Sequence, residues 1–476
     1  MKRRPLLQAS LAASLLGLSG AVRAAAQCDV IVVGGGGAGL SAAAAAAEAG
    51  LRVVLLEKQP AVGGNTLRSG GFFAAVDPKR QSLLGISDSI DKFRDQILEN
   101  GSGRSDPELA AVLAEGAGDM LAYLEAGGMR FKDDIIEIYG AHWARCHLPT
   151  LPNGEGYVRT LLSLAKKHGA EIVTGAKAVR LLQDGSGRVS GVAYRRNGVE
   201  LLCRASRGVI LASGGFGANP EMIGRFAPRL AGLTTDNTVG STGEMLLEAE
   251  RLGAELIDMH EVQCLPGRPP GGRRRVRLHN DVSRFIFVDR QGRRFVREDA
   301  RRDVIRDAVL ALPEKTAFSV VDDRGLRSYD ILVQKETVLG VETGDAWRGD
   351  SVAELALAMG IEPRVLVKTV DDYNRAVEAG RDPLGKSPDE LRHKLVKPPF
   401  WACYAAMTVH YTMGGVRINA RAEVLDGRGR PIPGLWAAGE VTGGIHGRNR
   451  MGANGINDAL VFGRIAGRRA AGLDAR

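Results

Sequence analysis

The chain has little cysteine and no cluster of it. Its five cysteines, Cys28, Cys146, Cys203, Cys264 and Cys403, are scattered over 476 residues. Neither CxxC nor CxxCH occurs, which excludes a c-type haem or an iron–sulfur cluster carried by this chain. We therefore expect five isolated buried thiols. The eight histidines show no spacing typical of metal ligands, so we predict no metal site.

Aromatic residues are also scarce, at 5% of the chain. No basic groove interleaved with aromatics and no recognised nucleic-acid-binding module is present, so we expect no nucleic-acid partner. The apolar content of 44% is sufficient for a large core, and the length allows two or three domains. The one apolar run, near the N-terminus, is too short for a stable membrane span, so we expect no integral span.

The formal net charge is +9, and four of the positive charges lie within residues 1–26. Much of the remainder is concentrated in GRRRVR, residues 272–277. This loop is either a solvated basic loop or the rim of a site that attracts anions.

Residues 1–26 have the pattern of an export signal. Arg3 and Arg4 precede a weakly apolar run that ends in small residues around Ala24. The segment resembles a twin-arginine signal, with Leu6 where the motif prefers Phe. We expect a periplasmic protein; the alternative is a cytoplasmic protein with a disordered tail.

The segment from Asp29 reads DVIVVGGGGAGLSAAAAAAEAGLRVVLLEK. An apolar strand is followed by Gly34, Gly36 and Gly39 in GxGxxG spacing, then by an Ala-rich helix and a second strand that ends at Glu57. Gly34 allows a tight turn, Gly36 lets the backbone approach a pyrophosphate, and Gly39 lets the helix pack against the strand. Glu57 would accept a hydrogen bond from a ribose. The segment predicts a Rossmann-like dinucleotide-binding α/β fold.

Two further groups of motifs lie along the chain. The first comprises GGNTLRSGG (63–71), VILASGGFGANPE (209–221) and LWAAGE (435–440); the second comprises HYTMGG (410–415) and GGIHGRNRMG (443–452). With the fingerprint, these motifs resemble the flavoprotein subunits of fumarate reductases and succinate dehydrogenases, above all the soluble secreted flavocytochrome c and urocanate reductase branch. The resemblance covers nearly the whole chain after residue 26.

The resemblance implies a glutathione-reductase-like FAD-binding domain with an α+β capping domain inserted in it. We expect boundaries at 27–261 and 402–476 for the FAD-binding domain, and 262–401 for the cap. We also expect helices over residues 107–127 and 242–253, turns at Asp184-Gly185 and Asn197-Gly198, and a hairpin over residues 285–296.

The cofactor that the resemblance implies is FAD. Asn65 stands where membrane-bound relatives carry a flavin-linked histidine, so the FAD should be non-covalent. Glu440 would contact the ribityl chain, and the helix starting at Asn454 would point its N-terminus at the flavin pyrimidine. Beyond the fingerprint glycines and Glu57, the expected cofactor-binding residues are Gly37, Ala38, Lys58, Gly64, Asn65, Thr66, Gly70, Gly71, Gly214, Gly215, Glu440, Asn454, Gly455 and Ile456.

The resemblance also assigns the chemistry. Reduction of an activated C=C bond needs a hydride from flavin N5, a proton on the neighbouring carbon, and cations that hold a carboxylate. His410 and Arg450 match the residues that clamp the carboxylate. Arg302, with Asp303 behind it, matches the proton donor on the cap.

The chain departs from fumarate reductases upstream of Arg302. Leu265 replaces the histidine that holds a second carboxylate, Leu278 lies near the relay glutamate, and Asp281 lies near the relay arginine. The remote end of the pocket is therefore apolar, or it binds a different group through Arg273 to Arg277 or His279. The proton relay would fall to His279, Asp281 or Asp303.

We therefore predict a secreted FAD-dependent enoate reductase that acts on an α,β-unsaturated monocarboxylate and not on fumarate. Its electrons would come from a separate cytochrome or FMN-bearing protein. The alternatives are a fumarate reductase proper, a ketosteroid-dehydrogenase-like enzyme running in the oxidative direction, and a non-catalytic flavin carrier.

Overall fold

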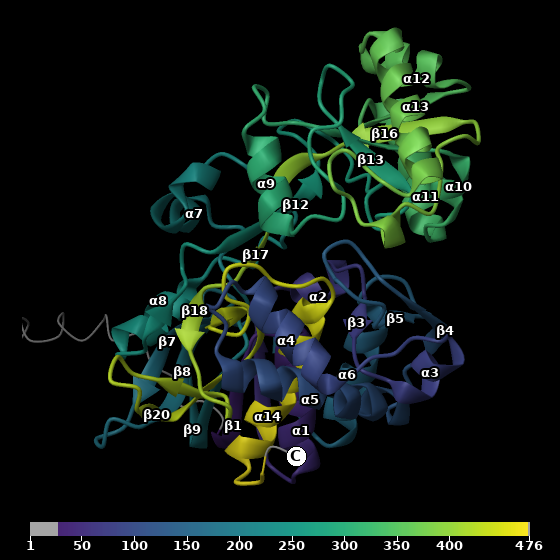
Figure 1. Cartoon of the computed structure of the whole chain (residues 1–476). Coiled ribbons are helices and arrows are strands. Elements are labelled where there is room, and N and C mark those ends of the chain that lie inside the picture. Colours follow the sequence, from purple (N-terminus) through teal and green to yellow (C-terminus); the bar gives the residue numbers. More distant parts are fainter. Residues whose placement is uncertain (1–26, 475–476) are drawn as a thin grey trace, which may run out of the picture.

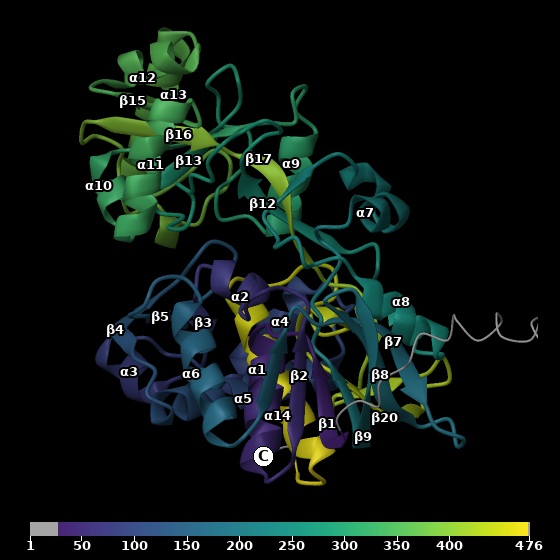
Figure 2. The same ribbon diagram turned by 180° about the vertical axis from the view of Figure 1, so that it is seen from behind.

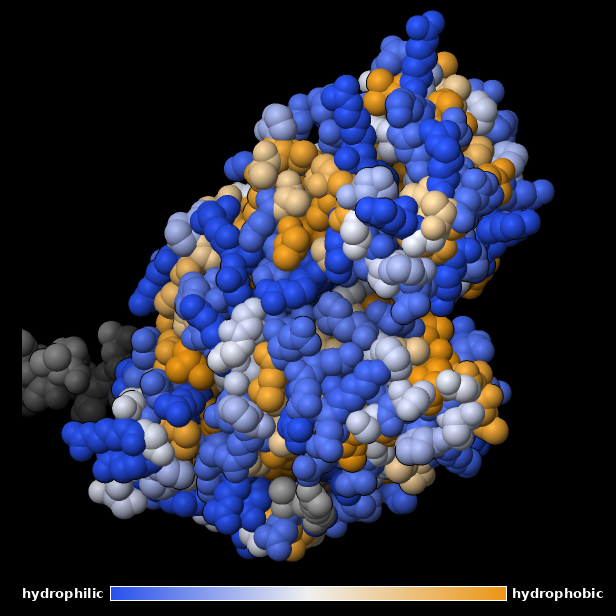
Figure 3. Space-filling model, in the orientation of Figure 1, coloured by the Kyte–Doolittle hydropathy of each residue, from blue (hydrophilic) through white to orange (hydrophobic). Residues whose placement is uncertain are grey.

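The computed structural model describes residues 27–474, so the predicted export signal lies outside the described residues. The chain forms a larger lower lobe and a smaller upper lobe, joined near β12 and β17 (Figures 1 and 2). In Figure 3 the surface narrows to a waist between the lobes, and the face in view is mostly hydrophilic. No described helix has the length and apolarity needed to cross a membrane.

The lower lobe is built on an eight-stranded sheet with the order β19-β20-β9-β1-β2-β6, extended by β7 and β8. Strands β20, β9, β1, β2 and β6 run parallel. This confirms the predicted α/β fold. The strands are β1 (Gln27–Val33), β2 (Val53–Glu57), β6 (Glu171–Thr174), β7 (Lys177–Gln183), β8 (Val189–Arg196), β9 (Val199–Leu211), β19 (Glu423–Leu425) and β20 (Pro431–Ala437).

Small residues let two helices of this lobe pack closely. In α1 (Gly37–Glu48) every residue except Glu48 is buried. Helix α14 (Asn454–Ala470) lies against it, and a Cβ on Gly463 would be 2.5 Å from the backbone oxygen of Ala38. A Cβ on Gly39 would lie 1.8 Å from the oxygen of Gly34, so only glycine allows α1 to leave the strand this tightly.

The remaining elements of the lower lobe surround this core. The predicted helix over residues 107–127 is confirmed as α5, which begins after Asp106, whose carboxylate accepts the N–H of Glu108 at 2.9 Å. The helix predicted near 242–253 is α8, and both predicted turns join consecutive strands. These elements are α2 (Gly64–Arg68), α3 (Pro78–Leu83), α4 (Ile90–Asn100), α5 (Pro107–Ala126), α6 (Glu155–Lys167), α8 (Glu244–Arg251), β3 (Phe73–Ala74), β4 (Phe131–Ile136) and β5 (Cys146–Pro149). Helix α7 (Pro220–Phe226) lies above them, at the level of the upper lobe (Figures 1 and 2).

The upper lobe has its own apolar core, whose members lie between Ile286 and Ala402. Its sheet has the order β13-β14-β16-β15. This agrees with an inserted cap, although the boundaries themselves stay a prediction. The elements are β13 (Phe285–Val288), β14 (Phe318–Val321), β15 (Ala346–Gly349), β16 (Phe400–Tyr404), α9 (Arg302–Leu310), α10 (Asp323–Arg327), α11 (Ile331–Thr343), α12 (Val352–Met359) and α13 (Pro363–Ala379).

The predicted hairpin over residues 285–296 is wrong. Strand β13 pairs with β14, and residues 293–296 form no strand. The turn after β13 exists, but the returning segment is held by a side chain instead of a ladder. The buried carboxylate of Glu298 accepts the N–H of Phe287 at 3.1 Å and pairs with Arg294 at 2.7 Å.

Two short sheets complete the fold: the first connects the lobes and positions the site, and the second lies in the lower lobe (Figure 1). One has the order β10 (Thr234–Thr235), β17 (Ala406–Thr412), β12 (Val262–Gly267); the other has β11 (Leu256–Ile257), β18 (Gly415–Arg417), β21 (Thr442–Gly443). The β12–β17 register places Gln263 opposite Tyr411, and β10 ends one residue before Asp236. Gln263, Asp236 and His410 thus meet although they are far apart in sequence.

All five cysteines are buried, as predicted, and none forms a disulfide among residues 27–474. They are not all isolated, however, because the thiols of Cys28 and Cys203 interact between β1 and β9.

Candidate active site

One cavity extends from the N-terminus of α1 to the region where the two lobes meet. Most of the predicted cofactor residues line it; Gly39, Gly215 and Asn454 do not. Arg302, His410 and Arg450 line its other end, whereas Asp303 does not. We call the two ends the fingerprint end and the arginine end.

The backbone of the fingerprint end is open to the cavity. A Cβ on Gly36 or on Gly214 would meet no atom within 4 Å, so both positions face free space. The N–H of Gly37 donates to Thr66 Oγ1 at 3.0 Å at the start of α1. An exposed glycine turn at a helix N-terminus is what a pyrophosphate requires.

Glu57 ends β2 and is 7% exposed. One of its oxygens accepts the N–H of Gly35 at 2.7 Å and the other accepts the N–H of Gln59 at 2.7 Å. Glu57 therefore fixes the shape of the glycine turn, and its expected bond to a ribose stays a prediction. The neighbouring Lys58 donates to Thr242 at 2.7 Å and pairs with Glu244 at 2.9 Å.

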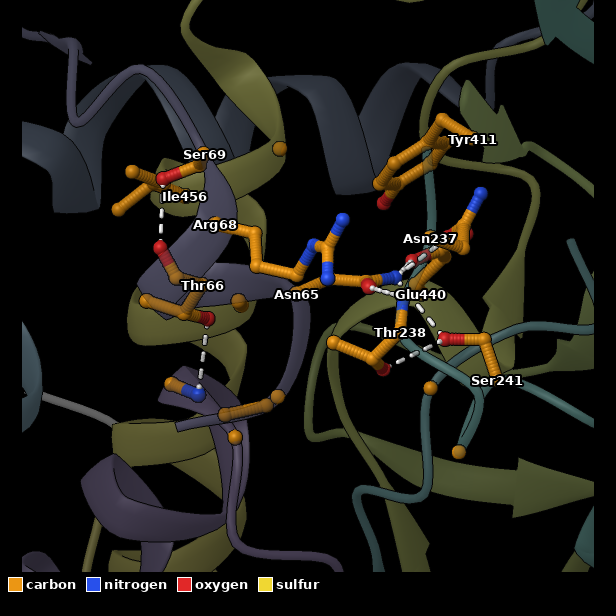
Figure 4. A pocket seen from close by; sticks show the side chains of 18 of the residues that line it. Asn65, Thr66, Arg68, Ser69, Asn237, Thr238, Ser241, Tyr411, Glu440 and Ile456 are labelled. Atoms are coloured by element: carbon orange, nitrogen blue, oxygen red, sulfur yellow. Dashed lines mark hydrogen bonds between the residues drawn. The ribbon is translucent and has the colours of Figure 1, made fainter. Parts of the chain in front are cut away.

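Asn65 is the centre of a polar network in the middle of the cavity (Figure 4). Its Nδ2 donates to Asn237, to Ser241 at 3.0 Å and to Glu440 at 3.2 Å, and its Oδ1 accepts the N–H of Thr238 at 2.8 Å. Burial raises the pKa of Glu440 to about 7, although Thr412 and Asn65 donate to it. A carboxyl group in this state can both accept and donate hydrogen bonds.

Two groups near this network have polar atoms without partners. Ser213 Oγ lines the cavity and Asn454 begins α14, and neither side chain forms a hydrogen bond among residues 27–474. Orphaned buried polar atoms beside an open glycine turn fit a polar cofactor of dinucleotide size. The residues present therefore fit FAD.

At the arginine end, two guanidinium groups share one neutral acceptor. Arg302 Nη1 and Arg450 Nη2 each donate to Gln263 Oε1 at 3.0 Å. The amide nitrogen of Gln263 donates to the Arg450 carbonyl oxygen at 2.8 Å, which turns its oxygen toward the arginines. Each arginine is 5% exposed, and neither forms an ion pair with any residue that the structure describes.

Burial and the neighbouring charge of Arg450 lower the pKa of Arg302 to about 9. Burial also lowers the pKa of Arg450. Two like charges that share a neutral acceptor in a buried site form a strong site for an anion.

His410 is held from behind by a carboxylate. Its Nδ1 lies 3.0 Å from an oxygen of Asp236, which also pairs with Arg275. Burial lowers the pKa of His410 to about 4, although Asp236 opposes this shift. Since Asp236 takes Nδ1, the other ring nitrogen, Nε2, is the one available to a substrate.

The candidate relay residues are not joined to Arg302 by hydrogen bonds. Asp303 accepts from Arg301 at 3.0 and 2.7 Å, and Asp281 pairs with Arg284 at 3.0 Å. Asp303 belongs to the first turn of α9, so its side chain points away from Arg302. His279 does line the cavity, edge-on to Tyr139, with Nδ1 unpartnered in the described chain.

The expectation that the remote end of the substrate pocket is entirely apolar is wrong. Leu265 lines the cavity as expected, but Leu278 is fully buried elsewhere. Arg275, Arg277 and His279 line the same wall, so the alternative in which the arginine loop faces the pocket is the one that the structure shows.

Sequence reasoning missed Gln263, Asp236 and Tyr139. Tyr139 stacks its ring 5.2 Å from the Arg302 guanidinium and accepts from it through its carbonyl oxygen at 2.7 Å. None of the three lies within a recognisable motif. Only one feature of the sequence pointed to Gln263. It lies two residues before Leu265, the position that a histidine occupies in fumarate reductases.

The fold and the cavity define an FAD-binding flavoprotein. Residues 29–456 match the family described as "FAD binding domain". The urocanate reductase of Eggerthella lenta is 37% identical over 460 residues, covering 94% of this chain and 75% of that protein. The acrylate reductase flavoprotein subunit of Shewanella woodyi is 34% identical over 435 residues, covering 87% and 85%.

Among solved structures, the open conformation of a flavocytochrome c3 fumarate reductase superposes with a TM-score of 0.77 at 34% identity, covering 94% of this chain and 79% of that one. The chain belongs to this FAD-binding family, and it is an FAD-dependent oxidoreductase of the type that reduces C=C bonds.

Proposed function

We propose that the protein reduces the C=C bond of an α,β-unsaturated carboxylate, which is held by Arg450 and His410 and protonated by Arg302. The observation that carries the proposal is the shared acceptor: two buried guanidiniums meet at Gln263 without a carboxylate partner. An acidic substrate supplies the missing negative charge.

Arg450 is placed to bind the carboxylate and not to transfer a proton. Its guanidinium lies 4.5 Å from the ring centre of Tyr411, whose hydroxyl donates to Asp458 at 2.8 Å. This stacking fixes the plane of the guanidinium, as two-point binding of a carboxylate requires. A carboxylate beside His410 would also raise the pKa of that ring, so a proton would be taken up with the substrate.

Arg302 has the properties of a proton donor. It lies at the start of a cap helix, close to the backbone of Gly140 and Gly452, where a Cβ would crowd its side chain at 2.6 and 3.1 Å. Its lowered pKa makes proton release easier than from an exposed arginine. Bound FAD, once reduced, supplies the hydride equivalent, so the saturated acid forms and Arg302 must then be reprotonated.

A screen of unsaturated acids tests the proposal. Purified, FAD-loaded protein is mixed with reduced viologen and each acid, and viologen oxidation is followed. We expect turnover with at least one 2-enoate and none with the corresponding saturated acid. If 3-ketosteroids are oxidised and no enoate is reduced, the ketosteroid-dehydrogenase-like alternative is correct.

The FAD is proposed to be non-covalent, because Asn65 has no imidazole to attach to the flavin. Acid precipitation should leave yellow FAD in the supernatant. Flavin that stays on the washed, denatured polypeptide would contradict this.

We further propose that electrons arrive from a separate cytochrome or FMN-bearing protein and that the enzyme is periplasmic. The support is the absence of haem- or cluster-binding motifs and the Arg3-Arg4 segment. Replacing both arginines by lysine should leave the protein in the cytoplasmic fraction; an unchanged periplasmic fraction would refute the export assignment.

A further inference from the structure

The loop that carries residues 273–277 is fixed by the cap. Both oxygens of Asp345 accept backbone N–H groups at 3.0 Å, from Arg273 and from Arg274. The Arg274 guanidinium makes a two-point bond with Glu336 of α11, at 3.1 Å to each oxygen. The loop is therefore anchored on its outer side and does not behave as a free basic loop.

Alternation along the loop sends side chains to opposite sides. Val276 is 3% exposed and packs near Gly340, whereas Arg275 and Arg277 on either side of it line the cavity. Residues two apart in an extended segment share a face, so both arginines point into the pocket.

The two inward arginines differ in their partners. Arg275 pairs with Asp236, the carboxylate that also holds His410. Arg277 forms no hydrogen bond and no ion pair with any residue between 27 and 474. Burial, and then the charge of Arg275, lower the pKa of Arg277 to about 10, so it still carries its charge at neutral pH.

Charge at the arginine end is unbalanced as a result. Asp236 serves Arg275 and His410, while Arg302, Arg450 and Arg277 have no carboxylate in contact. One substrate carboxylate at Arg450 compensates the positive charge of Arg302 and Arg450 only, and the charge of Arg277 remains. Arg277 is partly buried and lines the cavity without a partner among residues 27–474, so the substrate that fits best brings a second negative group to it.

We propose that Arg277 is the specificity-determining residue of this site and binds a second acidic group of the substrate, so that the preferred substrates are unsaturated diacids. This rests on the proposed function. It differs from the apolar-pocket expectation, because the loop arginine replaces the polar clamp that Leu265 lacks.

The test compares each diacid with its own monoester, which has nearly the same shape and one charge less. The panel contains fumarate with its monomethyl ester, glutaconate and 4-carboxycinnamate with the ester at the carboxyl remote from the enoate, and acrylate. We expect kcat/KM of the best diacid to exceed that of its monoester at least ~10²-fold, the discrimination typical of a site built for a polar group.

Three variants are measured on the same panel. Arg277→Leu should reduce the preference for the diacid over its monoester to less than ~10-fold, and Arg277→Lys should keep part of the preference. The control is Arg273→Leu, which removes the same charge from an exposed position of the same loop and should leave the preference intact.

The outcomes separate the two proposals. If acrylate or a monoester is reduced but no diacid is preferred, or if Arg277→Leu keeps the wild-type preference, the role of Arg277 is refuted and the reductase function stands. If no unsaturated acid is reduced by FAD-loaded wild type, the proposed function is refuted first.

Discussion

In the middle of the cavity, the polar side chains around Asn65 are paired with one another or with the backbone; at the arginine end, Arg302 and Arg450 lack carboxylate partners. Asn65 illustrates the first case, since its amide makes four hydrogen bonds to neighbouring residues. Arg302 and Arg450 illustrate the second, since both donate to one side-chain amide oxygen and otherwise only to backbone carbonyl oxygens.

The pKa shifts of buried groups also differ between these two parts of the cavity. Burial raises the pKa of Glu440 to about 7 near the Asn65 network, and burial together with nearby arginines lowers the pKa of His279 to about 3. The comparison shows that one end is preorganised by backbone shape and the other by an excess of positive charge that only a ligand completes.

The largest expected effect concerns backbone shape at the fingerprint end. Gly36→Val places a side chain in the space that a pyrophosphate needs, and its Cβ would have no protein atom within 4 Å. The protein should fold but lose FAD affinity at least ~10²-fold, or about 2.7 kcal/mol. Flavin absorbance after gel filtration, with circular dichroism for the fold, measures this. Gly185→Val, also in open space but on the β7–β8 turn, is the control and should retain its flavin.

The next effect separates proton donation from binding at the arginine end. Arg302→Ala should lower kcat at least ~10²-fold with FAD still bound. Arg301→Ala is the control, because Arg301 pairs with Asp303 and does not line the cavity. Steady-state kinetics with the best acid from the screen decides. A normal Arg302→Ala with an inactive Arg301→Ala would transfer the proton-donor role to Arg301.

A smaller effect should come from giving Arg302 and Arg450 a carboxylate partner within the protein. Gln263→Glu places a carboxylate where the shared oxygen lies, so it competes with the substrate for Arg302 and Arg450. We expect KM to rise at least ~10-fold and thermal stability to rise. Gln263→Leu, which removes the acceptor without adding charge, should lower thermal stability. A Gln263→Glu enzyme with unchanged KM would show that the guanidiniums are not the carboxylate site.

The last prediction concerns the pH dependence of stability and not activity. His279 has a folded pKa of about 3 against 6.5 when unfolded, so between these values the unfolded chain binds the extra proton. Its stabilising contribution is complete above pH 6.5 and is lost as pH falls toward 3, by up to ~1.4 kcal/mol per pH unit. His279→Phe should make urea-unfolding free energies less dependent on pH in this window. An equal slope in both proteins would contradict the shift.

The fingerprint end was predictable from sequence because contiguous motifs build it. The turn at Gly34 to Gly39 and the strand ending at Glu57 form the structure that their spacing indicates. The arginine end was predictable only in part. Motif matches located Arg302, His410 and Arg450, but Gln263 and Asp236 act through strand pairings that no local pattern encodes.

The hairpin error has the same origin. The apolar segment at Phe285 and the turn after it were real, but the pairing partner of β13 is β14, which lies beyond α9 in the chain. Local residues specify that a strand forms but not its partner; the nearest segment is instead held through the buried ion pair of Glu298 and Arg294.

The single oxygen of Gln263 also bears on how turnover ends. Arg450, which it helps to orient, would hold the carboxylate together with His410 through its charge, and reduction of the neighbouring double bond leaves that charge unaltered. The saturated acid therefore retains the hold of its precursor on the enzyme. Under the proposed function, the enzyme is subject to competitive inhibition by its own product, with an inhibition constant close to the dissociation constant of the substrate, and the rate at which the product departs limits turnover once chemistry is fast.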